Sequence, residues 1–452
     1  MREGLRSAVA PLYLFACLII GGSAQGIWEN LALQLSGLAI MAWAAAAPSN
    51  QVFPVAARSL LLIAGGAVAV SALQLVPLPP ALWAHGSRLA IADGFRLLGK
   101  PLPWLPVSLS PYAALGALLC LIPPLATFCA MTRLKAYHPS WVAGALLAGA
   151  LAGIMLGAVQ VASAGPGSSW YLYPQTNYGR AVGFFANSNH MADLLLISLP
   201  FVAAIAAAGK SRNIQGYSAL LFALAGITLV LIVGIALNGS LAGYLLSVPV
   251  IAGSLLILLP RGSRWRGAVG GLAVLALIAS IAALSTTSIG GTKVGSNARV
   301  AVQSRQEILA TSGKAIADNM PWGSGLGSFL KVYRLYERPE SVSTEYVIHA
   351  HNDYAEIALE LGLPGILLVL LFLGWWAVMS AAVWRMAGAG PFSRAASIAS
   401  ATILAHSAVD FPLRTAAISA CLAACCALLV DRRSSAGKGL TDLRPTRHLV
   451  IR

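Results

Sequence analysis

Residues 344–365 read TEYVIHAHNDYAEIALELGLPG, and this stretch decides both the fold class and the place where we expect chemistry. Its first half carries four polar residues capable of catalysis or binding, His349, His351, Asn352 and Asp353. It leads without a break into residues 357–383, an apolar run long enough to cross a membrane as a helix. A histidine-rich loop is therefore predicted at a membrane interface, at the start of a helix.

The composition is that of an integral membrane protein. Of the 452 residues, 58% are hydrophobic and only 10% are charged, whereas a soluble domain has about 25% charged residues. The formal net charge of +15 does not indicate a nucleic-acid partner, because Lys and Arg of membrane proteins collect in cytoplasmic loops. The six cysteines all lie in apolar segments, where we expect packing rather than a disulfide framework or a zinc site.

Apolar runs of roughly 20 residues indicate membrane-spanning helices, and they recur along the whole chain. They predict an all-α integral membrane protein with about twelve transmembrane helices in a single polytopic domain, residues 1–452. The predicted spans are residues 8–22, 31–47, 58–76, 112–131, 141–163, 189–208, 216–237, 241–259, 267–285, 357–383, 396–409 and 415–430. The long segments outside them are loops at about 77–111 and 286–356 and a tail at about 431–452.

The distribution of Lys and Arg predicts which loops lie on which side of the membrane. If the N-terminus is cytoplasmic, the short inner segments contain most of these residues, such as Arg261 and Arg266. The short outer turns then contain only Arg180 and Arg414. Because the predicted number of spans is even, we expect both termini in the cytoplasm and the His351 loop at the outer face.

The first long loop is rich in Pro and Trp. A short helix in the membrane interface is one interpretation of its apolar residues, Leu82, Trp83, Leu89, Ile91, Leu97 and Leu98. The alternative is that Trp and Pro simply anchor the chain at the level of the lipid headgroups.

The second long loop contains the main predicted element outside the membrane. Residues 299–319 are predicted to form an amphipathic helix whose apolar side carries Val302, Ile308, Leu309 and Ile316. A glycine-rich turn, residues 322–329, follows this helix. The turn lacks the Lys-Ser/Thr ending of a nucleotide-binding loop, so we expect no nucleotide site there.

His351 is the candidate catalytic residue. A neutral imidazole is a good general base near pH 7. If Asn352 caps the following helix, His351 lies at the positive end of that helix, where the helix dipole and nearby arginines favour the neutral form. A purely structural histidine is the alternative, and His349 is expected to support His351.

Three arginines are candidates for binding a phosphate group. Arg180 precedes a span, and charged groups at membrane depth are usually functional, although an ordinary interfacial arginine is the alternative. Arg299 and Arg305 lie on the predicted loop helix, and guanidinium groups bind phosphate through two hydrogen bonds. A solvated helix face is the competing explanation for these two. Four polar residues after Arg180 are expected to satisfy backbone ends and to pack helices, namely Asn187, Asn189, His190 and Asp193.

Carboxylates near the predicted outer face are expected to form ion pairs. Glu356 and Glu360 are four residues apart and share one helix face, so we expect them to pair with Arg180 or Arg414 rather than to act as catalytic acids. Asp410 and Arg414 are predicted to form a further pair between the last two spans.

Four segments together resemble a known family. His351-Asn352 followed by Gly362 and Gly365 resembles the signature of the O-antigen ligase and polysaccharide polymerase superfamily. The family's arginine segment is similar to RAVGFFANSNHMA in this chain. Its loop helix and glycine turn are similar to SRQEILA and PWGSGLGSF, and its late-chain motif is similar to HSAVDFPLR. The resemblance covers about residues 170–430.

The resemblance implies a bacterial inner-membrane enzyme with a periplasmic active site. Its donor would be a glycan linked to undecaprenyl diphosphate, and its acceptor a sugar hydroxyl on another glycan or on a lipid A core. His351 would deprotonate the acceptor, and Arg180 and Arg305 would bind the diphosphate, in an inverting transfer. The resemblance implies no metal, cofactor or nucleic acid, and leaves room for a partner protein that regulates chain length.

Three activities remain as alternatives for this sequence. A polymerase joins lipid-linked glycans to each other, whereas a ligase moves the finished chain to a different acceptor, and we favour the polymerase because nothing marks a lipid A core site. The third is a flippase or transporter for lipid-linked glycans. It predicts ionisable residues near the bilayer centre and two related halves, but the polar groups cluster at the predicted outer ends of the spans.

Overall fold

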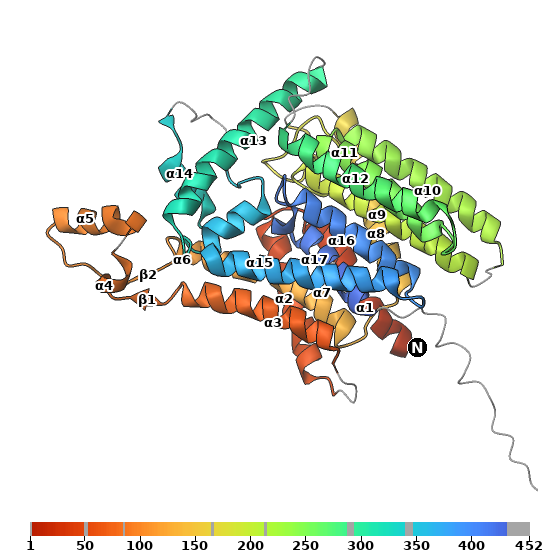
Figure 1. Ribbon diagram of the computed structural model, residues 1–452, viewed down its shortest axis with the longest axis horizontal. Helices are drawn as coiled ribbons and strands as arrows, with labels where there is room; N and C mark the ends of the chain where they lie inside the picture. The colour runs from red at the N-terminus through yellow and green to blue at the C-terminus, as the bar shows by residue number, and fades with distance from the viewer. Residues whose placement is uncertain are drawn as a thin grey trace, which may run out of the picture.

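The computed structural model describes residues 2–48, 53–84, 86–163, 167–211, 215–286, 293–339 and 347–431. In these ranges the protein is a bundle of helices with a single two-residue strand pair, which confirms the predicted all-α membrane fold (Figure 1). With Pro111–Thr132 counted as one helix, eight helices of the described residues are long and apolar enough to cross a membrane, and Gly4–Ile20 and Ala416–Val430 are shorter apolar helices. The count of twelve spans stays a prediction.

The helices follow the predicted apolar runs. The main ones are α1 (Arg2–Ile20), α2 (Ile27–Ala46), α3 (Val55–Leu73), α6 (Pro111–Leu119), α7 (Ile122–Thr132), α8 (Pro139–Ala162), α9 (Ser188–Ser211), α10 (Tyr217–Asn238), α11 (Leu241–Leu258), α12 (Trp265–Thr286), α13 (Lys293–Asp318), α14 (Phe329–Tyr336), α15 (Asp353–Arg385), α16 (Pro391–His406) and α17 (Ala416–Val430). All twelve predicted runs fall on these helices, with boundaries shifted by a few residues. The fourth run is divided between α6 and α7, just before two prolines that cannot donate backbone hydrogen bonds.

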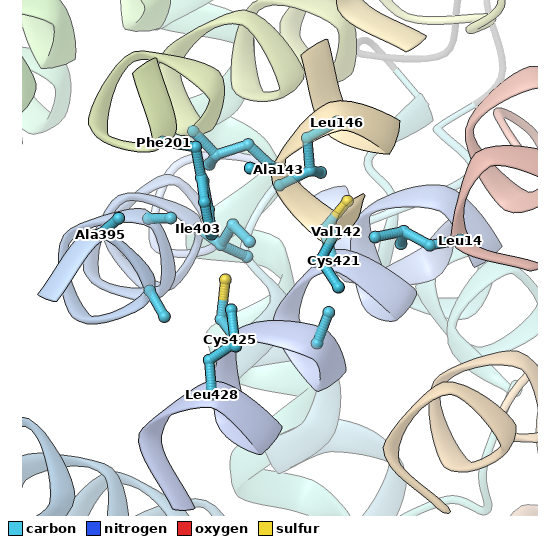
Figure 2. Close-up of a cluster of buried hydrophobic side chains, with 14 of the residues drawn as sticks. Leu14, Val142, Ala143, Leu146, Phe201, Ala395, Ile403, Cys421, Cys425 and Leu428 are labelled. Atoms are coloured by element: carbon cyan, nitrogen blue, oxygen red, sulfur yellow. The ribbon is translucent and has the colours of Figure 1, made fainter. Parts of the chain in front are cut away.

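Helix α9 is the centre of the bundle. It packs against α8, α10, α11 and α16, and most of its side chains are buried. Phe201 of α9 meets Leu146 of α8, Ile403 of α16 and Cys425 of α17 in an apolar core (Figure 2). The predicted packing role of the cysteines is confirmed for Cys17, Cys421, Cys425 and Cys426, which are buried and free, whereas Cys120 is exposed.

The described parts of the two long loops gather at one end of the bundle. We call this the His351 end, where α8, α10 and α16 finish and α9, α11 and α15 begin. There α13 packs against both α14 and the first part of α15 (Figure 1). The predicted amphipathic helix is confirmed and begins earlier, at Lys293. Ile308 is buried and Ile316 is partly buried, but Leu309 is 36% exposed, so its assignment to the apolar side is wrong.

The first long loop extends away from the bundle at the same end (Figure 1). It contains the strand pair β1 (Pro77–Leu78) and β2 (Leu105–Pro106), the short helices α4 (Pro80–Trp83) and α5 (Leu89–Leu97), and the 3-10 turn η1 (Gly86–Arg88). Of the two interpretations, the short helix is therefore present as α5, with Leu97 and Leu98 exposed, and its position in a membrane interface stays a prediction. Trp83 does not belong to an exposed interfacial face, because it is 3% exposed and its Nε1 donates to the Pro103 carbonyl at 2.9 Å.

Helix α15 is broken near its start by Gly362. This residue has φ 62° and ψ −147°, a combination that suits glycine. Pro364 has no N–H, so the Glu360 carbonyl loses its usual helical donor. The Leu363 N–H donates instead to the Pro321 carbonyl at 2.8 Å. The break therefore leaves backbone groups of α15 available to another segment of the chain.

The glycine-rich turn fills this break. Ser324 N donates to the Leu359 carbonyl and Gly325 N to the Glu360 carbonyl, both at 2.9 Å. Gln74, just after α3, also donates to the Glu360 carbonyl at 2.9 Å. These bonds fix the start of α15 against the loop and against α3.

Candidate functional site

The polar loop before α15 is held in place by the segment that follows α16. Asn352 caps α15, because its Oδ1 accepts from the Ala355 N–H at 2.9 Å, and this confirms the predicted cap. Its Nδ2 donates to the Ala408 carbonyl at 2.8 Å, and the Asp353 N–H donates to the Ser407 carbonyl at 2.9 Å. The histidine loop and the HSAVDFPLR motif therefore form one unit.

His351 pairs with Asp410. The Nδ1 atom of His351 lies 3.2 Å from Oδ1 of Asp410, which is fully buried, while the His351 side chain is 29% exposed. His351 also has φ 49°, a left-handed conformation that is uncommon outside glycine. When the imidazole is neutral, the carboxylate holds the proton on Nδ1, so that Nε2 keeps a lone pair and can accept a proton. This is the geometry of an oriented general base.

Asp410 has two further partners that fix its carboxylate. The Phe411 N–H donates to Oδ1 at 2.9 Å, and Asn189 of α9 donates its Nδ2 to Oδ2. Ser240, which precedes α11, donates in turn to the Asn189 Oδ1 at 2.7 Å. The sequence predicted only a packing role for Asn189, but in the structure its side chain also holds the Asp410 carboxylate. The predicted Asp410–Arg414 pair is wrong, because Asp410 faces His351 and Asn189 instead.

Arg180 reaches the same cluster from the segment before α9. Its NH1 donates to the Gly239 carbonyl at 2.8 Å, next to Ser240. Arg180 therefore bonds to the residue before Ser240, and Ser240 is the first member of the hydrogen-bonded chain that leads through Asn189 to Asp410. Within the described residues the Arg180 guanidinium has no carboxylate partner in an ion pair, so the remaining N–H donors suit an anionic ligand.

Arg299 and Arg305 belong to the first part of α13, and their side chains lie outside the described residues. The later part of the same helix is anchored, since Ile308 and Ala315 are buried together with Phe329 and Leu359. The proposed contact of Arg305 with a diphosphate stays a prediction.

Arg414 forms the centre of a second network. It lies 3.6 Å from Asp353, 3.3 Å from Glu356 and 3.2 Å from Glu360. The three carboxylates occupy positions i, i+3 and i+7 of α15, which share one helix face. The sequence left Arg180 and Arg414 as alternative partners for Glu356 and Glu360, and in the structure both glutamates pair with Arg414. Burial acts to lower the pKa of Arg414, but attraction to Glu356, Glu360 and Asp353 outweighs burial and raises that pKa above its usual value.

His349 belongs to this second network. Its Nδ1 lies 3.0 Å from Oε1 of Glu356, whose Oε2 accepts from the Ala350 N–H at 3.1 Å. His349 thus contacts the ion-pair cluster, whereas His351 contacts Asp410. The two histidines therefore have different partners, and the prediction that His349 supports His351 stays a prediction.

Phe411 lies between the two networks. Its ring centroid is 4.2 Å from that of His349, 5.0 Å from that of His351 and 5.1 Å from that of His190. Sequence reasoning did not select Phe411, although its place in the HSAVDFPLR motif, next to Asp410, was a usable signal. Three imidazole rings from two distant segments are therefore packed around one aromatic side chain.

A further buried pair lies behind these networks. His406 Nδ1 is 3.4 Å from Asp193 Oδ1, and both side chains are fully buried. Asp193 was expected to pack helices, and the pair joins α9 to α16. Among the described residues, no group of three or more His, Cys, Asp or Glu side chains is arranged to hold a metal ion. The predicted absence of a metal or cofactor stays a prediction.

The comparisons with known proteins bear on most of these elements. No curated protein matches the chain. A family model described as O-Antigen ligase matches residues 195–370, a range that includes His351, Arg305 and the Gly362 break. Arg180 and Asp410 lie outside the matched range but are joined to it by the contacts above. Residues 195–370 of this membrane protein are therefore similar to the O-antigen ligase family, which confirms the resemblance that the motifs indicated.

Proposed function

We propose that this protein is a membrane glycosyltransferase that moves a glycan en bloc from a lipid diphosphate carrier, undecaprenyl diphosphate, to a sugar hydroxyl. The family match supports a glycosyltransferase of the O-antigen ligase type. The observation that carries the proposal is the His351–Asp410 pair, an oriented base that is connected through Asn189 and Ser240 to the neighbourhood of Arg180.

The reaction follows from the roles that these residues can take. His351 Nε2 accepts the proton of the acceptor hydroxyl, and Asp410 stabilises the resulting imidazolium. The hydroxyl oxygen bonds to the anomeric carbon of the donor glycan as the bond from that carbon to the carrier diphosphate breaks. The bonding electron pair leaves with the diphosphate, whose growing charge Arg180 and Arg305 stabilise. Attack opposite the leaving group inverts the anomeric centre.

The networks around Arg414 and Asn352 have a structural task in this scheme. They fix the backbone on either side of His351 and hold Asp410 against it. A base that is already in position loses less entropy when the acceptor binds, which contributes directly to the rate.

The distribution of segments supports catalysis at the outer face. The loops that contain α4, α5, α13 and α14 all join the His351 end, which the Lys and Arg distribution predicts to be the outer face. In this proposal the outer face is the periplasmic side of a bacterial inner membrane. The ionisable pair Asp193–His406 lies near the ends of α9 and α16 rather than at their centres. The arrangement therefore favours a transferase over a flippase.

Purified protein with lipid-linked glycan repeats tests the proposal. A ladder of longer products with release of the carrier diphosphate would support a polymerase. Product that forms only after addition of a lipid A core acceptor would support a ligase. Carrier-linked glycan that stays unchanged with both acceptors, in a folded preparation that binds donor, would contradict the proposed function.

A further inference from the structure

The end of the bundle opposite His351 contains an unpaired buried cation. Arg394 lies in the first turn of α16 and is only 8% exposed, and its Nε has no hydrogen-bond partner. Within the described residues, no carboxylate lies within ion-pair distance of its guanidinium. An unpaired charge away from water is costly, so a buried guanidinium of this kind indicates a missing anionic partner.

Two further arginines lie next to Arg394. The Cζ atoms of Arg394 and Arg266 lie 5.7 Å and 6.0 Å from the ring centroid of the same residue, Trp384. Arg261 donates to the carbonyl of Met386 at 3.1 Å, at the end of α15. Three guanidinium groups therefore lie near one another: Arg261 comes from the loop between α11 and α12, Arg266 from the start of α12 and Arg394 from the start of α16.

The start of α16 adds partial positive charge. Its N-cap is Gly390, which offers no side-chain acceptor, and Pro391 follows it. The free N–H groups of such a helix start favour an anion. Asp431, an acidic residue among those described at this end, has other partners, because its Oδ2 accepts from the Tyr137 hydroxyl at 2.6 Å and lies 3.8 Å from Lys135 Nζ.

We propose that Arg261, Arg266 and Arg394, together with the start of α16, bind the phosphate of an anionic phospholipid. Guanidinium groups match phosphate oxygens through paired hydrogen bonds. This site is separate from the His351 site, because the part of α15 that follows the Gly362 break, residues 363–385, lies between the two and spans about 35 Å at 1.5 Å per residue. It does not depend on the proposed reaction.

A lipid fits the surroundings better than a free phosphate ion. Trp265, which is exposed and lies under Arg264 at 5.3 Å, is a typical residue of the headgroup level. An open hollow of about 750 Å³ runs along the same end of α15, with one arginine and otherwise apolar residues, Ala377, Val378, Ala381, Ala382, Arg385 and Met386. The hollow suits an acyl chain whose headgroup lies at the arginine cluster.

Delipidated full-length protein in detergent provides the test. Binding of phosphatidylglycerol, of zwitterionic phosphatidylethanolamine and of inorganic phosphate is measured by native mass spectrometry and by the shift in Tm. We expect phosphatidylglycerol to bind wild-type protein preferentially. Arg394→Gln should weaken that binding about tenfold, as expected for loss of a charge-assisted pair of hydrogen bonds. Arg264→Gln removes the same charge from an exposed site in the same region and should change binding by less than about twofold.

Three results would overturn the proposal. The first is equal binding of the two lipids by the wild type, and the second is equal binding of phosphatidylglycerol by the Arg394→Gln and Arg264→Gln variants. The third is a Tm shift with inorganic phosphate that is as large as the shift with phosphatidylglycerol and that Arg394→Gln reduces to the same extent. If Arg394→Gln does not fold, Arg394→Lys and Arg261→Gln serve in its place. Lysine keeps the charge without the planar fork, so weaker binding by Arg394→Lys would support the site and unchanged binding would refute it.

Discussion

Replacing Asp410 by asparagine is the sharpest test of the catalytic pair, because the structure shows why an isosteric amide does not fit. Both carboxylate oxygens accept hydrogen bonds: Oδ1 lies 3.2 Å from His351 Nδ1 and accepts from the Phe411 N–H, and Oδ2 accepts from Asn189. The amide NH2 of asparagine would meet a donor in either orientation. If it faces His351, it fixes the proton on Nε2 and removes the basic lone pair from the acceptor side.

The expected loss follows from that tautomer change. A histidine base held in the wrong tautomer by such a substitution loses on the order of 10³- to 10⁴-fold in kcat, which corresponds to about 4 to 5 kcal/mol of transition-state stabilisation. Binding of the lipid-linked donor should change little, because Asp410 is buried and contacts His351 rather than the donor. The measurement is the single-turnover rate with saturating donor, together with a donor binding curve.

Two controls separate a catalytic effect from a folding defect. Asp353→Asn removes a carboxylate that contacts Arg414 at 3.6 Å and not His351, so it should cost far less in rate. The double variant His351→Ala/Asp410→Asn should be no slower than His351→Ala alone, since the two residues act as a unit. A rate for Asp410→Asn within threefold of wild type, about 0.65 kcal/mol, or additive losses in the double variant would refute the reasoning.

Other substitutions test the remaining parts of the site. His351→Ala should abolish product while membrane insertion and donor binding persist, and near-normal turnover in an activity assay would exclude a general-base role. Arg305→Lys keeps the charge but loses the guanidinium fork, so donor KM should rise, and wild-type kinetics would remove Arg305 from diphosphate binding. Arg414→Gln leaves three buried carboxylates without their cation and should lower the free energy of unfolding by about 3 to 5 kcal/mol in denaturant titrations. Gly362→Ala should lower the free energy of unfolding by about 3 kcal/mol or more, because a Cβ there would lie within 3 Å of the Pro321 carbonyl. The control is Gly374→Ala, which lies in open space on the same helix and should be neutral or stabilising. Equal effects of the two substitutions would contradict the proposed role of the break.

The helices could be predicted from the sequence because a bilayer imposes a simple rule on composition. Runs of about 20 apolar residues have to form helices, since lipid offers no partner for backbone polar groups. That rule located α3, α8 and α9 to within a few residues. It could not show the break at Gly362, because the break depends on hydrogen bonds to a turn some 40 residues earlier. Nor could it show that Trp83 is buried, which depends on the pairing of β1 with β2.

The site was predictable at the level of segments but not of partners. Local rules were sufficient for the Asn352 cap, which needs only the residues next to it. Local rules could not predict the partner of Asp410. Arg414, four residues away and oppositely charged, was the natural choice, but three carboxylates of α15 already surround it. His351 and Asn189, which are 59 and 221 residues away, contact Asp410 instead.

These long separations have a consequence for synthesis. The reactive pair combines His351, which precedes α15, with Asp410, which follows α16, and the Asn189 that holds Asp410 comes from the first half of the chain. A nascent chain that has inserted everything up to α15 therefore contains the histidine without its carboxylate. Under the proposed function, competence for transfer would appear only when the turn between α16 and α17 has emerged and folded back. Under the same proposal, an incompletely made molecule would reside in the membrane without acting on lipid-linked glycans.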